Sequence, residues 1–219
     1  MPSDRPPGRF PPLAVTPDLP ISSERRVWDG RFPLDVIHFR HRRFDGALSG
    51  PRTWELWRRG RAAALLPYDP ARDAVVLIEQ FRLPALAAGI EPVLVELPAG
   101  LADPGEDAAT TLTREAAEET GLVPDRLTRI GEVLLSPGGS DELCAVFAGR
   151  VRAPDPAADG LLGQAGLAAE DEDIRVRLWP AEAAIEAALA GRFANALTML
   201  ALLWLAARRP MLQAEWSDP

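Results

Sequence analysis

The chain contains no lysine, a single cysteine and only two histidines, and each shortage excludes a kind of chemistry. Without lysine there can be no Walker-type phosphate loop and no Schiff-base catalysis. The one cysteine, Cys144, permits no intramolecular disulfide and no paired-thiol zinc site, which favours a reducing compartment such as the cytoplasm. The two histidines, His38 and His41, have no nucleophile-elbow motif nearby, so a serine–histidine–acid triad is not expected.

Long apolar runs and excess positive charge are also missing. The longest apolar stretch, residues 196–207, is shorter than the roughly 20 residues that span a bilayer, and the N-terminus has no signal-peptide pattern. A net charge of −8 argues against a general nucleic-acid binder. We therefore expect a cytoplasmic protein without a membrane or nucleic-acid partner. The arginines that crowd the first third form either a solvated surface or a contribution to anion binding.

Proline content and strand patterns divide the chain into three parts. Residues 1–20 hold seven prolines and are expected to form a flexible arm. Residues 21–58 show the alternation and turn residues of a small antiparallel β unit. Residues 59–219 are long enough to bury a core and are expected to form the main domain.

The main domain mixes strand and helix patterns without strict βαβ alternation, which predicts an α+β layered fold. Strands are expected at residues 62–68, 74–81, 93–97, 130–135, 143–151 and 174–178. Helices are expected at residues 107–120, 180–190 and 194–208, with Pro210 stopping the last one.

Residues 100–122 match the spacing G-x5-E-x7-R-E-U-x-E-E-x-G-U, where U is apolar, and a chance match over the whole chain has a probability of about a few in a million. The fixed positions are Gly100, Glu106, Arg114, Glu115, Glu118, Glu119 and Gly121. On a helix, the carboxylates at 115, 118 and 119 project within an arc of about 100°. Such a cluster repels itself unless a cation is present, and hard oxygen ligands select Mg²⁺ or Mn²⁺.

The simpler alternative is a solvated glutamate-rich helix in which Arg114 pairs with Glu118. The combined spacing of the loop and the helix disfavours it. Arg114 and Glu106 are interpreted as supports that orient the cluster, while Gly100 permits a tight turn. Gly121 is the expected residue after the helix end.

These residues, together with segments 61–70, 75–82, 96–100, 136–139 and 170–174, resemble the Nudix superfamily and, within it, the bacterial ADP-ribose pyrophosphatases. The resemblance implies a Nudix αβα sandwich with a mixed β-sheet. It also implies a homodimer in which the N-terminal β unit is exchanged between subunits and helps to bind the adenosine of the substrate.

The resemblance further implies roles for particular residues. Glu115 and Glu119 are expected to bind Mg²⁺, with Glu118 and the carbonyl of Ala99 assisting. Glu170 is expected to contact the metal site and to act as the general base, with Glu172 as the second choice.

Substrate contacts are implied outside the motif, each with a plainer alternative. Arg82 either grips a pyrophosphate oxygen or forms a surface salt bridge. Ser136, Gly138 and Glu142 either contact the terminal ribose or form an ordinary turn. Trp28 either stacks on the adenine or only packs, and Trp54 departs from the arginine that similar enzymes carry.

The expected activity is Mg²⁺-dependent hydrolysis of ADP-ribose to AMP and ribose 5-phosphate. Another nucleoside diphosphate sugar, such as GDP-mannose, is the nearest alternative substrate. A non-catalytic module that senses ADP-ribose would predict a broken motif, whereas this one is intact. An isoprenoid diphosphate isomerase would need a reactive Cys144, but its apolar neighbours indicate a core residue.

Overall fold

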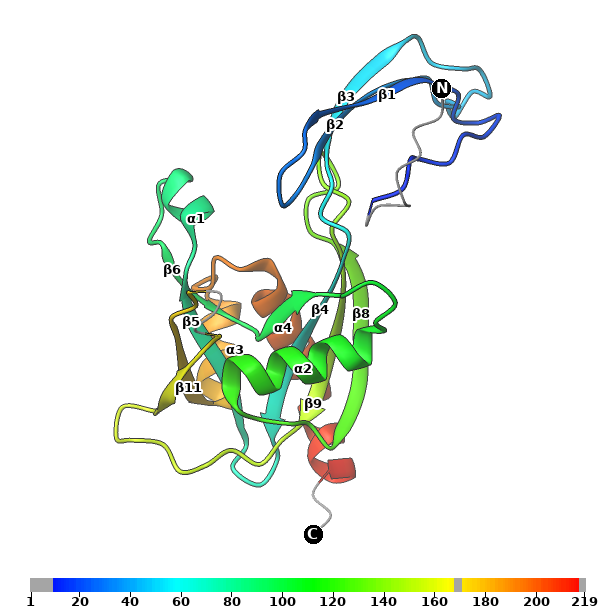
Figure 1. Cartoon of the computed structure of the whole chain (residues 1–219). Helices are drawn as coiled ribbons and strands as arrows, with labels where there is room; N and C mark the ends of the chain where they lie inside the picture. Colours follow the sequence, from blue (N-terminus) through cyan, green and yellow to red (C-terminus); the bar gives the residue numbers. More distant parts are fainter. Residues whose placement is uncertain (1–9, 168–170, 217–219) are drawn as a thin grey trace. The chain divides into compact units, whose positions relative to one another are not determined.

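The computed structural model describes residues 10–167 and 171–216 (Figure 1). It divides into two compact units. The smaller unit comprises the chain up to Arg61 together with Leu134–Leu143, and the larger unit comprises Ala62–Val133 and the chain from Cys144 onward. The segment that carries Ser136, Gly138 and Glu142 therefore folds with the N-terminal residues.

The smaller unit is built on a three-stranded antiparallel sheet in the order β1–β2–β3. Its strands are β1 (Ile21–Trp28), β2 (Leu34–Phe39) and β3 (Arg52–Trp57). From residue 10 onward the N-terminal arm contacts this sheet: the N–H of Leu13 donates to Glu24, and the carbonyl of Pro11 accepts from Arg58. The expected β unit is thus present as a meander.

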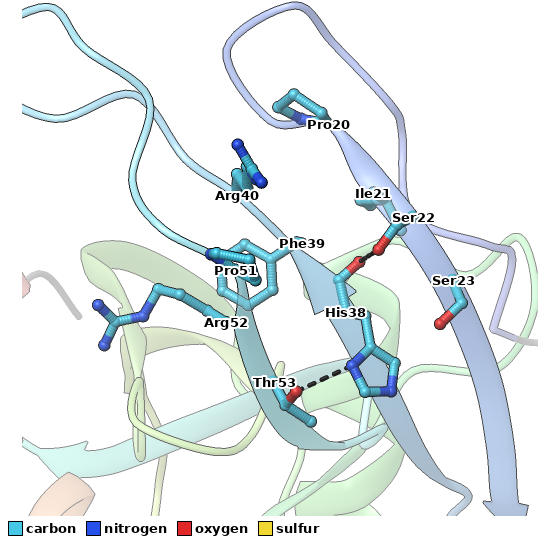
Figure 2. Close-up of a pocket in the computed structure, with 10 residues that line it drawn as sticks. All are labelled: Pro20, Ile21, Ser22, Ser23, His38, Phe39, Arg40, Pro51, Arg52 and Thr53. Atoms are coloured by element: carbon cyan, nitrogen blue, oxygen red, sulfur yellow. Dashed lines mark hydrogen bonds between the residues drawn. The ribbon is translucent and has the colours of Figure 1, made fainter.

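A cleft of about 570 Å³ lies at one end of this sheet, as Figure 2 shows. In its wall the hydroxyl of Thr53 is hydrogen-bonded to Nδ1 of His38 at 2.8 Å, and Arg40 and Arg52 are exposed. None of the residues predicted to bind substrate or metal lines this cleft.

The larger unit contains a mixed sheet in the order β10–β11–β5–β4–β9–β8, with β6 paired to β5 and β7 paired to β4. The strands are β4 (Arg61–Asp69), β5 (Ala74–Phe81), β6 (Val93–Glu96), β7 (Ala99–Leu101), β8 (Arg126–Leu134), β9 (Leu143–Arg150), β10 (Leu161–Ala165) and β11 (Ile174–Pro180). The helices are α1 (Leu83–Ala87), α2 (Ala108–Thr120), α3 (Ala181–Leu189) and α4 (Ala196–Trp216).

Apolar side chains on both faces of β4 and β5 explain why helices cover the sheet on both sides. Leu66 and Leu77 point into the cluster that packs against α3 and α4, whereas Leu65 packs with Leu112 and Ala116 of α2. Because successive side chains of a strand alternate between faces, a continuous apolar run requires cover on both. Figure 1 shows α2 on one face of the sheet and α3 and α4 on the other, which confirms the predicted α+β sandwich.

The sheet splits between β4 and β5. These two strands pair only next to their hairpin, at Tyr68–Val75 and Asp69–Ala74. Further on, β5 pairs with β6 and β4 pairs with β7. The short link from β6 to β7, residues 97–98, therefore lies at the split, and β7 begins directly after it.

The sequence-based elements lie close to those of the structure, except that β8 begins at Arg126 and not at the predicted residue 130, three short elements were not predicted, and one helix end is wrong. Elements α1, β7 and β10 were not predicted, since each has five residues or fewer and no clear periodicity. The prediction that Pro210 stops the last helix is wrong, because α4 continues to Trp216 with Pro210 inside it. Leu212 and Trp216 are buried in the core, and this packing offsets the roughly 3 kcal/mol that an interior proline costs. No helix in the described part of the chain is both long and apolar enough to cross a membrane.

Asp73 ties the β4–β5 turn to α4. Its Oδ1 accepts hydrogen bonds from the Tyr68 hydroxyl and from Nε of Arg209, each at 2.8 Å. The Arg209 guanidinium lowers the pKa of Asp73 against the opposing effect of burial, and the Tyr68 hydroxyl adds to the lowering. Asp73 also has a φ of 49°, a conformation that asparagine tolerates as well.

Replacing Asp73 with asparagine keeps the turn and removes the charge, so D73N is expected to lower the free energy of unfolding by about 1–3 kcal/mol near neutral pH. Because the folded pKa is lowered, this contribution is present above the ordinary aspartate pKa of about 3.9 and fades as the pH falls through the folded value. Urea unfolding at several pH values measures both effects.

Asp155 provides the control, because it is 93% exposed and pairs with Arg72. D155N should change stability by less than about 0.5 kcal/mol. Equal losses in the two variants, or a D73N loss that stays unchanged at about pH 3, would contradict the assignment.

Candidate active site

Helix α2 is held in place by its caps and by one apolar stripe. The side chain of Asp107 caps its N-terminus by accepting from the N–H of Thr110 at 2.8 Å. Gly121 ends it in the left-handed conformation, with φ at 71°. Leu112 and Ala116 are buried against the sheet. The caps fix the length of the helix and the stripe fixes its rotation, so both determine where the glutamates point.

The Glu115 carboxylate lies against the backbone of Gly100 in β7. A Cβ added to Gly100 would stand 1.9 Å from Oε1 of Glu115. Only glycine leaves room for this approach. Burial raises the pKa of Glu115, partly offset by the neighbouring Arg114.

The Glu119 carboxylate is buried beside the same strand, with 4% of the residue exposed. Its Oε2 accepts a hydrogen bond from the N–H of Ala99 at 2.8 Å. Burial raises the pKa of Glu119 to about 8. The hydrogen bond from the Ala99 N–H lowers this pKa, whereas the negative charges of Glu115 and Glu172 raise it further. A buried carboxyl group near two other carboxylates is stabilised in its charged form when a cation binds beside it.

Arg114 binds three carboxylates and one carbonyl. Its Nη1 donates to Glu115 at 2.8 Å and to Glu118 at 3.1 Å. Its Nε and Nη2 donate to Glu106, each at 3.2 Å, and Nη2 also donates to the carbonyl of Leu101. The Arg114 guanidinium lowers the pKa of Glu106 to about 2. Arg114 therefore joins Glu106 to Glu115 and Glu118, and the role of Arg114 and Glu106 as supports of a metal site stays a prediction.

The three motif glutamates are close, but their side chains have different partners. Arg114 joins Glu115 to Glu118, whereas Glu119 turns to Ala99. Within the described residues, no three histidine, cysteine, aspartate or glutamate side chains are gathered into a preformed metal site. The donors nevertheless fit a hard divalent cation, since Glu119 is a buried carboxylate, Glu115 is a partly buried one, and the charge of Glu115 adds to the raised pKa of Glu119.

Arg82 follows β5 and is ion-paired with Glu96. Its Nε and Nη2 both donate to Oε2 of Glu96, at 3.0 and 2.7 Å. The charges of Glu119 and Glu172 also act on it and raise its pKa, against the lowering effect of burial. The predicted surface salt bridge is therefore present, but its partner is a buried carboxylate next to the motif.

Glu170, the predicted base, lies outside the described residues. Its described flanks lie beside α2, since the N–H of Gly166 donates to the carbonyl of Glu118 at 3.3 Å. Oε2 of Glu172 accepts a hydrogen bond from the N–H of Leu167 at 3.1 Å. Glu172, the second choice, acts electrostatically on Glu115, Glu119 and Arg82.

The residues predicted to contact the ribose lie in the smaller unit, on the loop between β8 and β9. Glu142 is ion-paired with Arg59, Nε to Oε2 at 2.9 Å, and the Arg59 guanidinium also lies over the ring of Phe32. Asp141 anchors the loop by accepting from Nε of the buried Arg58 at 2.7 Å. Burial tends to raise the pKa of Asp141, but the N–H groups of Arg59 and Gly60 and the Arg58 charge lower it.

The other residues predicted to contact the substrate are exposed or have free space beside them. Ser136 starts the turn, with its carbonyl accepting from the N–H of Ser140 at 2.9 Å. A Cβ added at Gly138 would meet no atom of the described chain within 4 Å. Trp28 is 66% exposed and folds over Gly30, while Trp54 is 51% exposed and packs edge-on against Phe39. These aromatic surfaces are available for contacts.

The sequence misses the place of Glu96 in the site but predicts the core position of Cys144. The sequence predicts no role for Glu96 beyond its place in segment 96–100, although its burial next to Arg82 makes it part of the site. A glutamate at the end of an apolar strand was the available signal. Cys144 is fully buried in β9, which confirms the expectation of a core residue.

Comparison with known proteins gives matches over most of the chain. A family model described as NUDIX domain matches residues 58–200. The ADP-ribose pyrophosphatase of Escherichia coli (strain K12) is 40% identical over 200 residues, covering 91% of this chain and 93% of that protein. The ADP-ribose pyrophosphatase of Haemophilus influenzae is 36% identical over 202 residues, covering 91% of both chains.

Two other similar proteins differ in name. A GDP-mannose pyrophosphatase of Salmonella arizonae is 31% identical over 192 residues, covering 87% of this chain and 96% of its own. A solved structure titled as an ADP compounds hydrolase superposes with a TM-score of 0.64 at 21% identity, covering 93% of this chain and 98% of its own. This structural likeness supports the fold.

The close approach of Glu115 to Gly100 can be tested by filling the space. In G100A the new Cβ displaces the Glu115 carboxylate, so we expect Mg²⁺ affinity, measured by calorimetry, to fall about tenfold or more. Gly131 of β8 is the matched control, because a Cβ added there meets no described atom within 4 Å. Unchanged Mg²⁺ affinity in G100A, or an equal loss in G131A, would count against this geometry.

Proposed function

Because the chain belongs to the Nudix family, we propose that it is a pyrophosphohydrolase that cleaves ADP-ribose to AMP and ribose 5-phosphate. The observation that carries the reaction type is the seating of Glu115 and Glu119 against β7, at Gly100 and Ala99. A non-catalytic sensor would have no need of one buried and one partly buried carboxylate, whose removal from water costs free energy in the absence of a cation.

The choice of substrate rests on the relatives. Identity to the ADP-ribose pyrophosphatase of Escherichia coli is 40%, whereas identity to the GDP-mannose pyrophosphatase is 31%. GDP-mannose remains the second candidate, because the same carboxylates could cleave its pyrophosphate. The two substrates differ in their nucleobase and in their sugar, whereas the pyrophosphate bonds that react are the same.

Mg²⁺ is the proposed cofactor, with Mn²⁺ as a substitute. Glu115 and Glu119 would hold it, with Glu118 and the Ala99 carbonyl assisting and Glu170 as a further contact. When bound, it offsets the negative charge that develops on the pyrophosphate oxygens. Arg114 orients Glu115 and Glu118 from Nη1, and its own position is fixed by Glu106.

The carboxylate of Glu170 is the proposed general base. A water oxygen forms a bond to one phosphorus as the bond from that phosphorus to the bridging oxygen breaks, and the base carboxylate receives a proton from the water. Glu172 is the alternative base, supported by its electrostatic coupling to Glu115 and Glu119. The Arg82 guanidinium is proposed to bind a pyrophosphate oxygen.

Substrate recognition is proposed for residues of the smaller unit: Ser136, Gly138 and Glu142 at the terminal ribose and Trp28 at the adenine. The exposed indole of Trp28 supports the stacking role. We further propose a homodimer that exchanges the N-terminal β unit, and a cytoplasmic location, which the lone buried cysteine supports.

The proposed activity is tested by incubating the full chain with Mg²⁺ and a panel of nucleotide sugars, including ADP-ribose and GDP-mannose. We expect ADP-ribose to be cleaved with the highest kcat/KM, giving AMP and ribose 5-phosphate. In E119Q the metal ligand is neutral, and kcat is expected to fall by about 100-fold or more. Cleavage of no member of the panel, or an unchanged rate in E119Q, refutes the enzymatic proposal, and a preference for GDP-mannose refutes the substrate.

The identity of the base is tested by comparing E170Q with E172Q. For E170Q we expect kcat to fall about 100-fold or more while Mg²⁺ affinity changes less than the rate does. E172Q should retain more activity. The reverse ranking assigns the base to Glu172, and near-normal turnover in both variants excludes this segment as the source of the base.

A further inference from the structure

The Arg82 guanidinium uses only one of its edges inside the protein. Nε and Nη2 form the edge that faces Glu96, and both bonds end on the single oxygen Oε2. No hydrogen bond from Nη1 to another described residue occurs. A guanidinium has five N–H donors in a rigid plane, so fixing one edge also fixes the direction of the others.

The partner that fixes this edge is unusually confined. The Glu96 side chain is 7% exposed, against 39% for Arg82. Glu96 ends β6 and pairs in register with the fully buried Ile78 of β5. Three residues later the chain reaches Ala99, whose N–H binds Glu119. One short backbone segment thus positions both the partner of Arg82 and the partner of Glu119.

Two carboxylates besides Glu96 act electrostatically on Arg82. The charges of Glu119 and Glu172 both attract it. The pairing of β11 with β5 ends with Ile174 opposite Gln80, and Glu172 and Arg82 each lie two residues beyond this pair. Without Glu96, the guanidinium would be free to turn toward these carboxylates, which would neutralise them and remove its donors from a bound phosphate.

We propose that Glu96 is a positioning residue that holds Arg82 by one edge, so that the other edge serves the substrate pyrophosphate and does not pair with Glu119 or Glu172. This inference rests on the proposed function. Glu96 itself touches no reacting atom, and its effect passes entirely through Arg82. Its removal should therefore weaken the binding of the pyrophosphate more than it slows the chemical step.

A double-mutant cycle separates this role from a merely structural one. In E96L the volume is kept and the acceptor is lost, so KM for ADP-ribose should rise about tenfold or more while kcat changes less than about threefold. The Kd for the non-hydrolysable α,β-methylene analogue of ADP-ribose should rise by the same factor. E96Q should restore most of the affinity, because one amide oxygen can accept both hydrogen bonds. In an R82A background, E96L should have no further effect.

Glu79 supplies the matched control. It lies on β5, three residues before Arg82, and accepts a hydrogen bond from Nε of Arg177 at 2.9 Å. Because side chains alternate along an extended chain, Glu79 is on the opposite face from Arg82. E79Q should change KM and kcat by less than about twofold. Losses from E96L and R82A that simply add, or a fall in kcat with an unchanged KM, overturn the proposal.

If E96L does not fold, E96D decides the question, since the shorter side chain keeps the charge but withdraws it from the guanidinium. A KM increase in E96D that disappears in the R82A background supports positioning, and an equal increase in both backgrounds overturns it. Wild-type turnover is measured in the same assay. Its absence refutes the proposed function, whereas turnover with additive variants refutes only the role of Glu96.

Discussion

The placement of two carboxylates, the buried Glu119 and the partly buried Glu115, against the backbone of β7 is the constraint on which the larger unit depends. Removing a carboxylate from water without a full partner costs several kcal/mol, and here one N–H from Ala99 compensates only in part. The packing of α2 against the sheet must offset the remaining free-energy cost. The burial of Leu112 and the close contact of Ala116 hold α2 to the sheet, and a fully buried leucine contributes about 1.5–3 kcal/mol.

Arginine joins groups of carboxylates at two places in the chain. Arg114 contacts Glu106, Glu115 and Glu118 at once, and Arg58 is buried among Glu24, Asp35 and Asp141. A planar fork with five donors can serve several carboxylates in fixed directions, whereas a lysine ammonium acts as a point charge. The arginines that crowd the first third therefore include structural centres. The alternatives of a solvated surface and of anion binding did not describe Arg58.

What could be predicted from the sequence is what depends on local periodicity and fixed spacing. The strand β4 can be recognised from its long apolar run, whose residues are buried on both faces. The amphipathic helix α2 can be recognised from its long pattern and from Asp107 and Gly121 at its two ends. The end of α4 could not, since Pro210 is tolerated only because Leu212 and Trp216 reach the core. The Arg82–Glu96 pair joins residues 14 positions apart across β5 and β6, and no periodicity reports such a contact. The roles of Trp28, Ser136 and Glu142 came from resemblance and stay predictions.

The division of the chain also separates reaction type from substrate choice. The motif carboxylates, their support Arg114 and the Arg82–Glu96 pair all belong to the larger unit, whereas the proposed ribose and adenine contacts belong to the smaller one. The loop 134–143 folds with the smaller unit because Asp141 is bound by Arg58 and by the N–H groups of Arg59 and Gly60. Under the proposed recognition, substitutions in that unit would change the recognised nucleoside or sugar while α2 and β7 keep their contacts.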